Sequence, residues 1–440
     1  MEKQITREQI TIFRKSYQEK TINKILENKI AKNGLKKACL RQEIIQENLP
    51  VFNVELPNKI RYDQKETNKC WIYSGLNMIH YHMAENLHID PMKFSLSSSY
   101  IEFFDKLEKA NHIYERIIEK KALNIKQLQS QSFLNDNLTE CGYWQWFASI
   151  VNKYGLVPET CMPNMIEDEE HQVLENIWKE KVKKGISKLL DLKKEEVSNK
   201  ILRDEKEECL KEIYCLLCKL IGEPKETFNY KYEDKRGEDI QLEQMTPKQF
   251  QERYLNWNLD DFVILGNVPA SDKPYERVYE EKYLGNIHAN SKISFLNMPI
   301  EVLKEATLQQ LKENIPVVVG AHILKYRDKK SGVLDTRLYA YDEMLEFEDL
   351  TKTEALDLLD IRMHHVMTIV GAQVEVDGIK RWKVEDSYGT DEKMDGYYIM
   401  NDNYFDAFVL IVVIHKKYLT QEQQLLLQQK PILYDTREVI

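Results

Sequence analysis

Residues 63–71 of the chain read Asp-Gln-Lys-Glu-Thr-Asn-Lys-Cys-Trp, and Cys70 in this stretch opens a run with helical periodicity. Apolar side chains recur every three or four positions after it, at Ile72, Leu76, Ile79, Met83 and Leu87. That spacing places them on one face of a helix, the face that a protein buries. The sequence therefore predicts a core helix from about residue 70, with Cys70 at or near its N-terminus.

This position suits a nucleophile. A thiol attacks only as the thiolate, and its reference pKa of about 8.5 is lowered by the partial positive charge at a helix N-terminus. The backbone N–H of Cys70 could bind a developing oxyanion there, and Gln64, six residues upstream, could donate a second hydrogen bond. The alternative is plain core packing, which is the more common role of a buried cysteine on a helix.

A second segment supplies a possible acid and base. Residues 363–371 read Met-His-His-Val-Met-Thr-Ile-Val-Gly, and residues 381–389 read Arg-Trp-Lys-Val-Glu-Asp-Ser-Tyr-Gly. His365 opens one apolar strand and Asp386 ends another, so two neighbouring strands would bring them within reach. An imidazole could hold and deliver the proton, and a carboxylate could orient it. The alternative is a surface histidine and an unrelated aspartate at the end of a strand.

Taken together, these segments resemble the papain superfamily: Gln-x5-Cys-Trp, a later histidine before an apolar strand, and Asp-Ser-aromatic-Gly some twenty residues beyond. The long interval between Cys70 and His365 resembles the bleomycin hydrolase and aminopeptidase C family of papain-like (C1) cysteine peptidases, which carry large helical insertions. Further similar segments follow in order along the chain, among them 94–100, 103–106, 142–146, 246–250 and 297–300.

The resemblance implies an α+β, papain-like, two-lobed cysteine peptidase fold with large helical insertions. It implies that Cys70 is the nucleophile, His365 the acid and base, Gln64 the oxyanion-hole donor and Asp386 the orienting residue. It also implies a thiol protease of the aminopeptidase type that acts on peptide substrates, needs no metal or cofactor, and assembles as a homohexamer.

The order of predicted elements agrees with such a division. Residues 1–60 are predicted to be an N-terminal helical extension, and 61–260 a helical lobe that carries Cys70, with helical insertions around 100–135 and 165–225 for oligomer contacts. Residues 261–425 contain short β-favouring runs and are predicted to be a β-rich lobe that carries His365 and Asp386. Residues 426–440 are a C-terminal tail that, by resemblance, reaches the cleft.

The sequence departs from the family pattern in two places next to the predicted site. Asp386 stands where the family has asparagine, and its charge should favour the imidazolium, raise the pKa of His365 and shift the pH optimum. Asn68 stands where the family usually has glycine. Asparagine accepts a positive φ, so we expect the turn before Cys70 to keep its shape.

Three further departures bear on substrate binding. Tyr388 replaces the tryptophan that covers the family's histidine–asparagine pair, and His322 stands where relatives carry an acidic residue, either as a structural group or as a substrate contact. In the family, the terminal carboxylate captures the amino group of the substrate. The tail of this chain ends differently, in Thr-Arg-Glu-Val-Ile, so a cysteine endopeptidase or amide hydrolase without strict amino-terminal selectivity is the first alternative. A catalytically silent papain-fold scaffold or binding protein is the second.

Composition narrows the class of protein. The net charge of −10 argues against a dedicated nucleic-acid binder. The charged start lacks the apolar core of a signal peptide, and the longest aliphatic run, 407–414, is too short to span a bilayer, so we expect a cytoplasmic protein. The seven cysteines are predicted to be free thiols, and Cys215-Leu-Leu-Cys218 lies in a helical pattern without a second ligand pair.

Overall fold

The computed structural model of the chain describes residues 4–56, 62–65, 67–119, 137–166, 170–282, 284–288, 292–346, 348–387 and 396–434. Among these residues no helix combines the length and the apolar character that crossing a bilayer would require.

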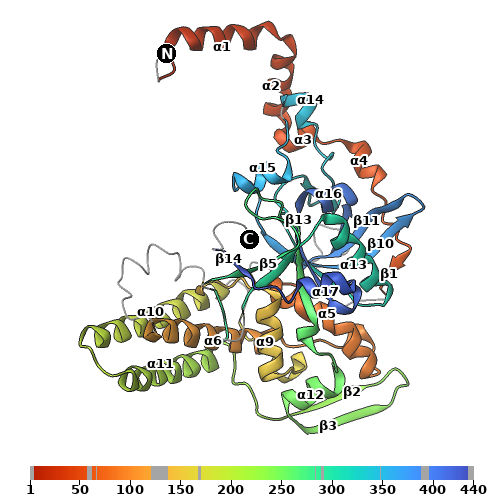
Figure 1. Cartoon of the computed structure of the whole chain (residues 1–440). Helices are drawn as coiled ribbons and strands as arrows, with labels where there is room; N and C mark the ends of the chain where they lie inside the picture. The colour runs from red at the N-terminus through yellow and green to blue at the C-terminus, as the bar shows by residue number, and fades with distance from the viewer. Residues whose placement is uncertain are drawn as a thin grey trace.

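The chain begins with a helical arm that projects from the body (Figure 1). The arm consists of α1 (Arg7–Glu19), which Thr6 caps, and α2 (Thr21–Asn33), and neither helix contains a buried residue. Two short helices, α3 (Leu35–Cys39) and α4 (Gln42–Glu47), lead from the arm to the body, where Ala38, Cys39 and Ile44 are buried.

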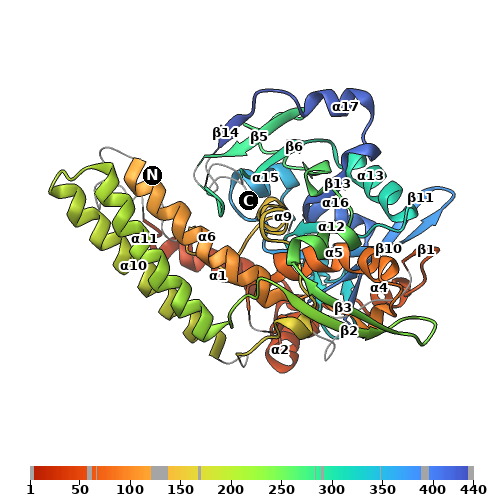
Figure 2. The same ribbon diagram turned by 90° about the horizontal axis from the view of Figure 1, so that it is seen from below.

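Within the described residues, the helical half contains α5 (Cys70–Asn86), α6 (Ser98–Glu119), α9 (Trp144–Tyr154), α10 (His171–Lys194) and α11 (Asn199–Leu220). The last two form a hairpin that lies along α6, as the views in Figures 1 and 2 both show. Helix α5 packs against α6 and α9 on one side and against the large sheet on the other. Cys70 therefore lies at the boundary between the helices and the sheet.

The large sheet has twelve strands in the order β14-β5-β6-β4-β13-β7-β10-β11-β12-β9-β8, with β1 paired to β10. Most pairs are antiparallel, and β4–β6, β12–β9 and β14–β5 are parallel. In chain order the strands are β1 (Val54–Glu55), β4 (Phe262–Gly266), β5 (Arg277–Glu281), β6 (Ser294–Asn297), β7 (Val317–Ala321), β8 (Arg327–Asp328), β9 (Val333–Leu334), β10 (His365–Glu375), β11 (Gly378–Glu385), β12 (Tyr397–Asn401), β13 (Val409–His415) and β14 (Ile432–Tyr434).

The register of the central strands brings the predicted site residues to one end of the sheet. His365 is the first residue of β10 and lies opposite Ala321 at the end of β7. Strand β11 runs antiparallel to β10 and pairs Glu385 with Thr368. Asp386 follows the last residue of β11 and so returns to the end at which β10 begins.

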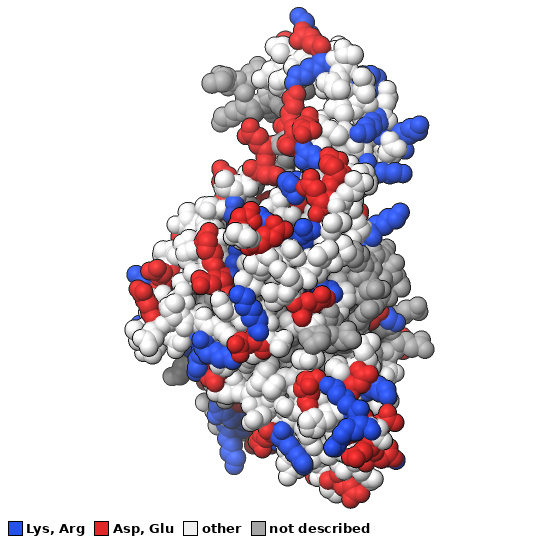
Figure 3. Space-filling view, turned by 90° about the vertical axis from the view of Figure 1, so that its right-hand side faces the viewer, with Lys and Arg blue, Asp and Glu red and all other residues white. Residues whose placement is uncertain are grey.

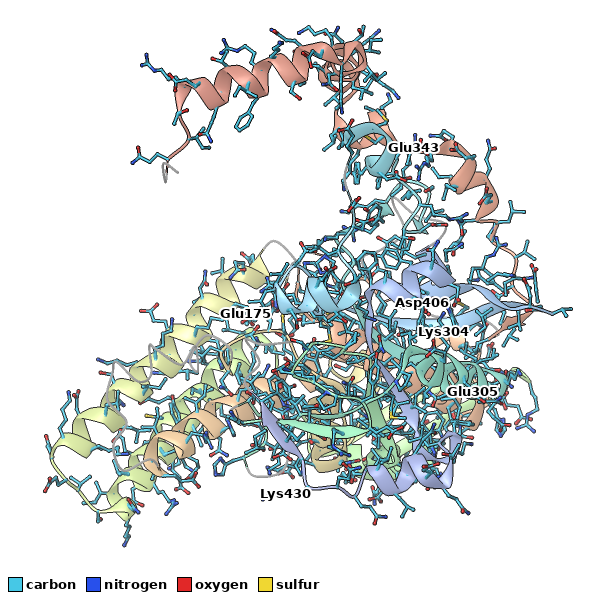
Figure 4. The ribbon with its side chains drawn as sticks, turned by 45° about the horizontal axis from the view of Figure 1, so that its top comes forward. Glu175, Lys304, Glu305, Glu343, Asp406 and Lys430 are labelled. Carbon is cyan, nitrogen blue, oxygen red and sulfur yellow. The ribbon has the colours of Figure 1, made fainter. Side chains whose placement is uncertain are left out.

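Smaller elements complete the fold. A separate hairpin joins β2 (Phe228–Glu233) to β3 (Asp239–Met245). The remaining helices in the part of the chain that the structure describes are α12 (Pro247–Tyr254), α13 (Ile300–Lys312), α14 (Tyr341–Leu345), α15 (Lys352–Asp357), α16 (Asp402–Phe408), α17 (Gln421–Leu426) and the short 3-10 turns η1 (Pro91–Lys93), η2 (Glu159–Cys161), η4 (Leu259–Asp261) and η5 (Lys416–Tyr418). Lys304 of α13 forms ion pairs with Asp402 and Asp406 of α16, and Figure 4 labels Lys304 and Asp406 side by side.

The α+β class and the papain-like order of elements are confirmed. Strands β4, β7, β10, β11, β12 and β13 lie on the short β-favouring runs predicted within residues 261–425. The sequence analysis did not predict the β2–β3 hairpin, nor helices α13 and α16 within the β-rich part. All seven cysteines are free, and Cys215 and Cys218 lie on α11.

Candidate active site

Cys70 is the first residue of α5, as the helical periodicity predicts. The preceding residue, Lys69, makes no side-chain cap to the helix, so the positive end of the helix dipole is directed at the cysteine without a competing side-chain oxygen. Trp71 and Ile72 are buried beside it. The first turn of the helix is thus fixed by packing, while Cys70 itself retains a small exposed fraction of 9%.

His365 and Asp386 form a buried pair, with 2.7 Å between the imidazole Nε2 and the carboxylate Oδ1. The side chain of Cys70 lies close enough to the imidazole of His365 to contribute to its raised pKa. The three side chains therefore lie together as a Cys70–His365–Asp386 triad at the boundary between α5 and the sheet.

The electrostatics of this triad favour a charged imidazole on His365. Burial disfavours a charged imidazole, but the charge of Asp386, its hydrogen bond and the Cys70 sulfur outweigh that effect and raise the pKa of His365 to about 9. An imidazolium at neutral pH stabilises a thiolate next to it. The arrangement can therefore hold a charged nucleophile and a proton donor side by side.

Gln64 links the two sides of the site. Its side-chain N–H donates to the carbonyl of Thr67 at 2.6 Å, and its side-chain oxygen accepts a hydrogen bond from the hydroxyl of Ser387. Its backbone N–H donates to the carbonyl of Ser387 at 2.6 Å. An amide carries two N–H groups, so one remains beyond the bond to Thr67. The side chain is 1% exposed and is fixed between the turn before Cys70 and the residue after Asp386.

Asn68 keeps the turn by a different means from the one predicted. A positive φ occurs in this turn at Lys65, at 47°, and not at Asn68, so the tolerance of asparagine for a positive φ is not used here. Asn68 instead directs its backbone N–H and its side-chain amide to the carboxylate of Glu140, at 3.1 and 3.3 Å. Here a polar contact replaces the conformational freedom of glycine.

The other departures from the family pattern are at Tyr388, in the tail and at His322. Tyr388 and Gly389 lie outside the described residues, as does the tail beyond Tyr434. His322 is buried, its Nδ1 lies 3.2 Å from the carbonyl of Arg362, and its ring packs at 6.3 Å from that of His364, the residue before His365. Burial lowers the pKa of both histidines, so they remain neutral at pH 7.

A cluster of buried charges below the turn was missed by the sequence analysis. Lys69 pairs with Glu102 at 2.8 Å, Lys109 pairs with Asp105 at 2.7 Å, Lys106 pairs with Glu175, and His171 bonds to Glu140. Figure 4 shows Glu175 where the α10–α11 hairpin meets the rest of the chain. On α6 the charged positions recur with helical spacing, at 102, 105, 106 and 109. Such a stripe normally predicts a solvent-facing side, and here α10 covers it.

Four members of this cluster also have the donor types of a metal site. Ligand atoms of Glu102, Glu140, His171 and Glu175 lie within 4.8 Å of one another. However, the ammonium groups of Lys69 and Lys106 already lie against two of these carboxylates. The negative charge is thus met by cations of the protein itself, and we assign no metal to this cluster.

Comparison with known proteins gives consistent matches over the whole length. The model of the Peptidase C1-like family matches residues 4–437. The chain is 32% identical to Aminopeptidase C of Listeria monocytogenes over 434 residues, which cover 98% of this chain and 97% of that protein. It is 32% identical to Aminopeptidase G of Lactobacillus delbrueckii subsp. lactis over 439 residues, or 98% of each chain.

A solved structure shares the complete architecture. The crystal structure of pepw from lactobacillus rhamnosis superposes with a TM-score of 0.95 at 28% identity, and the superposition covers 100% of this chain and 99% of that one. The helical insertions and the arm are therefore part of the shared fold and not additions peculiar to this chain.

Proposed function

This chain belongs to the Peptidase C1-like family, and from that premise we propose that it is a cysteine-type aminopeptidase, which hydrolyses peptides from the N-terminus. Relatives that align over nearly the full length are named aminopeptidases C, G and E, which supports both the thiol-peptidase chemistry and the exopeptidase mode. The observation that carries the chemistry is the buried contact between His365 and Asp386 next to Cys70 at the start of α5.

The proposed reaction uses side chains of this chain alone. The Cys70 thiolate attacks the carbonyl carbon of the peptide, and the resulting oxyanion is bound by the backbone N–H of Cys70 and a side-chain N–H of Gln64. His365 gives its proton to the departing amine, which leaves a thioester on Cys70. His365 then takes a proton from water, and the hydroxide that forms hydrolyses the thioester. Asp386 keeps the imidazole oriented and stabilises its charged form.

Selective labelling tests the nucleophile. At limiting iodoacetamide and neutral pH, we expect peptide mapping to find the adduct on Cys70. Cys141 is the stringent comparison because it is an exposed residue near Cys70, yet desolvation of its sulfur raises the pKa of its thiol. The variant Cys141→Ser should therefore keep full hydrolysis, whereas Cys70→Ala should lose it. An adduct found first on any other cysteine would contradict the proposal and favour a silent scaffold.

Amino-terminal selectivity needs its own test, because the residues that would impose it in the tail, 435–440, lie outside the described structure. We propose that the tail reaches the cleft. Its last described strand, β14, pairs with β5, and Tyr434 is buried there. Peptides with a free amino terminus should be cleaved at least about tenfold faster than their N-acetylated forms. Equal rates would identify a broader endopeptidase or amide hydrolase.

We further propose that the protein assembles as a homohexamer and that it lies in the cytoplasm. We also propose that the chain divides into the helical lobe, 61–260, and the β-rich lobe, 261–425, as predicted from the sequence. The arm supports assembly because it exposes Ile10, Ile12, Phe13, Tyr17 and Ile25 and buries none of its side chains. Figure 3 shows acidic and basic side chains interspersed along it. Helices of 13 residues are marginal in water without a packing partner, so a second copy is the natural cover for their apolar side chains. Light scattering should give about six times 52.2 kDa, and a monomer would contradict this. Cell fractionation tests the compartment.

A further inference from the structure

The turn that carries Cys70 is held from both sides by one loop. Glu140 accepts the backbone N–H and the side-chain amide of Asn68, two residues before the nucleophile. Its backbone carbonyl accepts the indole N–H of Trp71, one residue after it, at 2.7 Å. Glu140 thus contacts the residues on either side of Cys70 but is not a member of the Cys70–His365–Asp386 triad.

The carboxylate of Glu140 is itself fixed from a distant part of the sequence. His171, the first residue of α10, bonds to its other oxygen. Burial disfavours the charged carboxylate, but the bond from His171, the charges of Lys106 and His171, and the Asn68 N–H lower the pKa of Glu140 to about 2. Glu140 therefore stays ionised at every pH at which the enzyme would work.

The loop around Glu140 is anchored independently of the turn. Lys109 of α6, a fully buried residue, donates to the carbonyls of Thr139 and Cys141, at 2.9 and 3.2 Å. The carbonyls on either side of Glu140 are thereby tied to a long helix. Glu140 can act as a rigid reference for the turn because its own backbone has little freedom to follow the turn's movements.

We propose that Glu140, held by His171, is a positioning residue for the oxyanion hole. This inference rests on the function proposed above. The two oxyanion donors are the backbone N–H of Cys70 and the amide of Gln64, and Gln64 is attached to the same turn through the carbonyl of Thr67. Holding Asn68 in place fixes the path between these two donors. The α10–α11 hairpin then acts on catalysis through His171.

This role separates two reactions of Cys70. Peptide hydrolysis needs the oxyanion hole, because its transition state places negative charge on the carbonyl oxygen. Alkylation by iodoacetamide needs the thiolate but forms no oxyanion. A loosened turn should therefore slow hydrolysis and leave alkylation unchanged, whereas a damaged thiolate or a partly unfolded protein slows both.

The test compares Glu140→Gln with the wild-type enzyme and with Glu108→Gln. Glu108 is a matched control because it is also a buried carboxylate, on α6, and it pairs with Lys153 and Tyr154 of α9. We expect Glu140→Gln to lower kcat by about tenfold or more, with KM and the alkylation rate of Cys70 within about twofold of wild type. Glu108→Gln should leave all three parameters near the wild-type values.

Two outcomes overturn the inference: kcat and the alkylation rate falling together, or neither changing. If Glu140→Gln fails to fold, His171→Gln replaces it, because that variant keeps the carboxylate and removes only its support. The expected pattern is the same, with a smaller loss of kcat. The proposed function is judged separately in the same assays: a wild-type protein that neither hydrolyses peptides nor alkylates at Cys70 would refute the function itself.

Discussion

The sheet side and the helix side of the site are held by different kinds of interaction. On the sheet side, His365 starts a strand whose first eight residues are all buried, and backbone pairing with β7 and β11 fixes its position. On the helix side, Cys70 follows Lys69, and the ion pair of Lys69 with Glu102 belongs to the buried charge cluster. Backbone register thus places the histidine, whereas buried ion pairs, together with the packing of Trp71 and Ile72, place the cysteine.

The difference bears on how each side tolerates substitution. Backbone hydrogen bonds in a sheet survive most changes of side chain, so the sheet side should be altered mainly at His365 and Asp386 themselves. A buried ion pair that loses one partner leaves an uncompensated charge, which typically costs about 3–5 kcal/mol. The helix side should therefore respond to substitutions at residues that never approach the substrate.

The largest expected effect lies on the sheet side, at Asp386. Replacing it with alanine removes the orienting contact of a buried histidine and should lower kcat/KM by about 100-fold or more. Asp386→Asn keeps a hydrogen-bond acceptor but removes the charge that raises the pKa of His365 to about 9. In the wild-type enzyme the imidazolium persists until the pH rises through about 9, so activity should be lost on the alkaline side there.

In Asp386→Asn, the alkaline limb of the pH profile should move to lower pH by about one unit or more, since each unit corresponds to about 1.4 kcal/mol of lost interaction. The measurement is kcat/KM as a function of pH between about pH 5 and pH 10. The reference pKa values of a free imidazole and a free thiol, about 6.5 and about 8.5, serve for comparison. An alkaline limb unchanged by the substitution would show that the carboxylate does not set the charge of His365. Only the backbone register would then distinguish the sheet side from the helix side.

The same division explains what could be predicted from the sequence. The pairing of His365 with Asp386 was predictable because each residue ends an apolar run with a strand pattern, and register then fixes their meeting. The start of α5 at Cys70 followed from the periodicity of its apolar residues. The charge cluster was not predictable, because Glu102, Lys106 and Lys109 have the spacing of an exposed helix face.

Only the tertiary position of α10, added by an insertion, turns the charged face of α6 into an interior one. The same reason applies to Asn68. From the sequence it was interpreted as a substitute for glycine in backbone conformation, and its partner Glu140 lies 72 positions away along the chain. Contacts between a local motif and a distant loop leave no periodicity in either segment.

An effect of intermediate size is expected from substituting two glycines on the helix side, because an added methyl group would disturb the packing there. A Cβ on Gly142 would meet the indole ring of Trp71, and a Cβ on Gly185 of α10 would meet the hydroxyl of Tyr114 on α6. Both Gly142→Ala and Gly185→Ala should lower the free energy of unfolding by about 1–3 kcal/mol, measured by denaturant titration. Only Gly142→Ala should also lower kcat, because only Trp71 adjoins Cys70. A comparable loss of kcat in Gly185→Ala would mean that the helix side transmits any loss of stability to the nucleophile.

The smallest expected effect separates the two bonds between Asn68 and Glu140. Asn68→Ala removes the side-chain bond of 3.3 Å, which lies at an exposed position, and keeps the backbone bond of 3.1 Å. Since an exposed hydrogen bond contributes at the low end of about 0.5–1.5 kcal/mol, kcat should fall only about twofold. Asn68→Asp keeps the same size but places a carboxylate against the ionised Glu140, and this repulsion should lower kcat by about tenfold. A loss in the alanine variant as large as that in the aspartate variant would mean that the side-chain amide, and not the backbone, holds the turn. The helix side would then depend on the residue type at position 68 as strictly as the sheet side depends on Asp386.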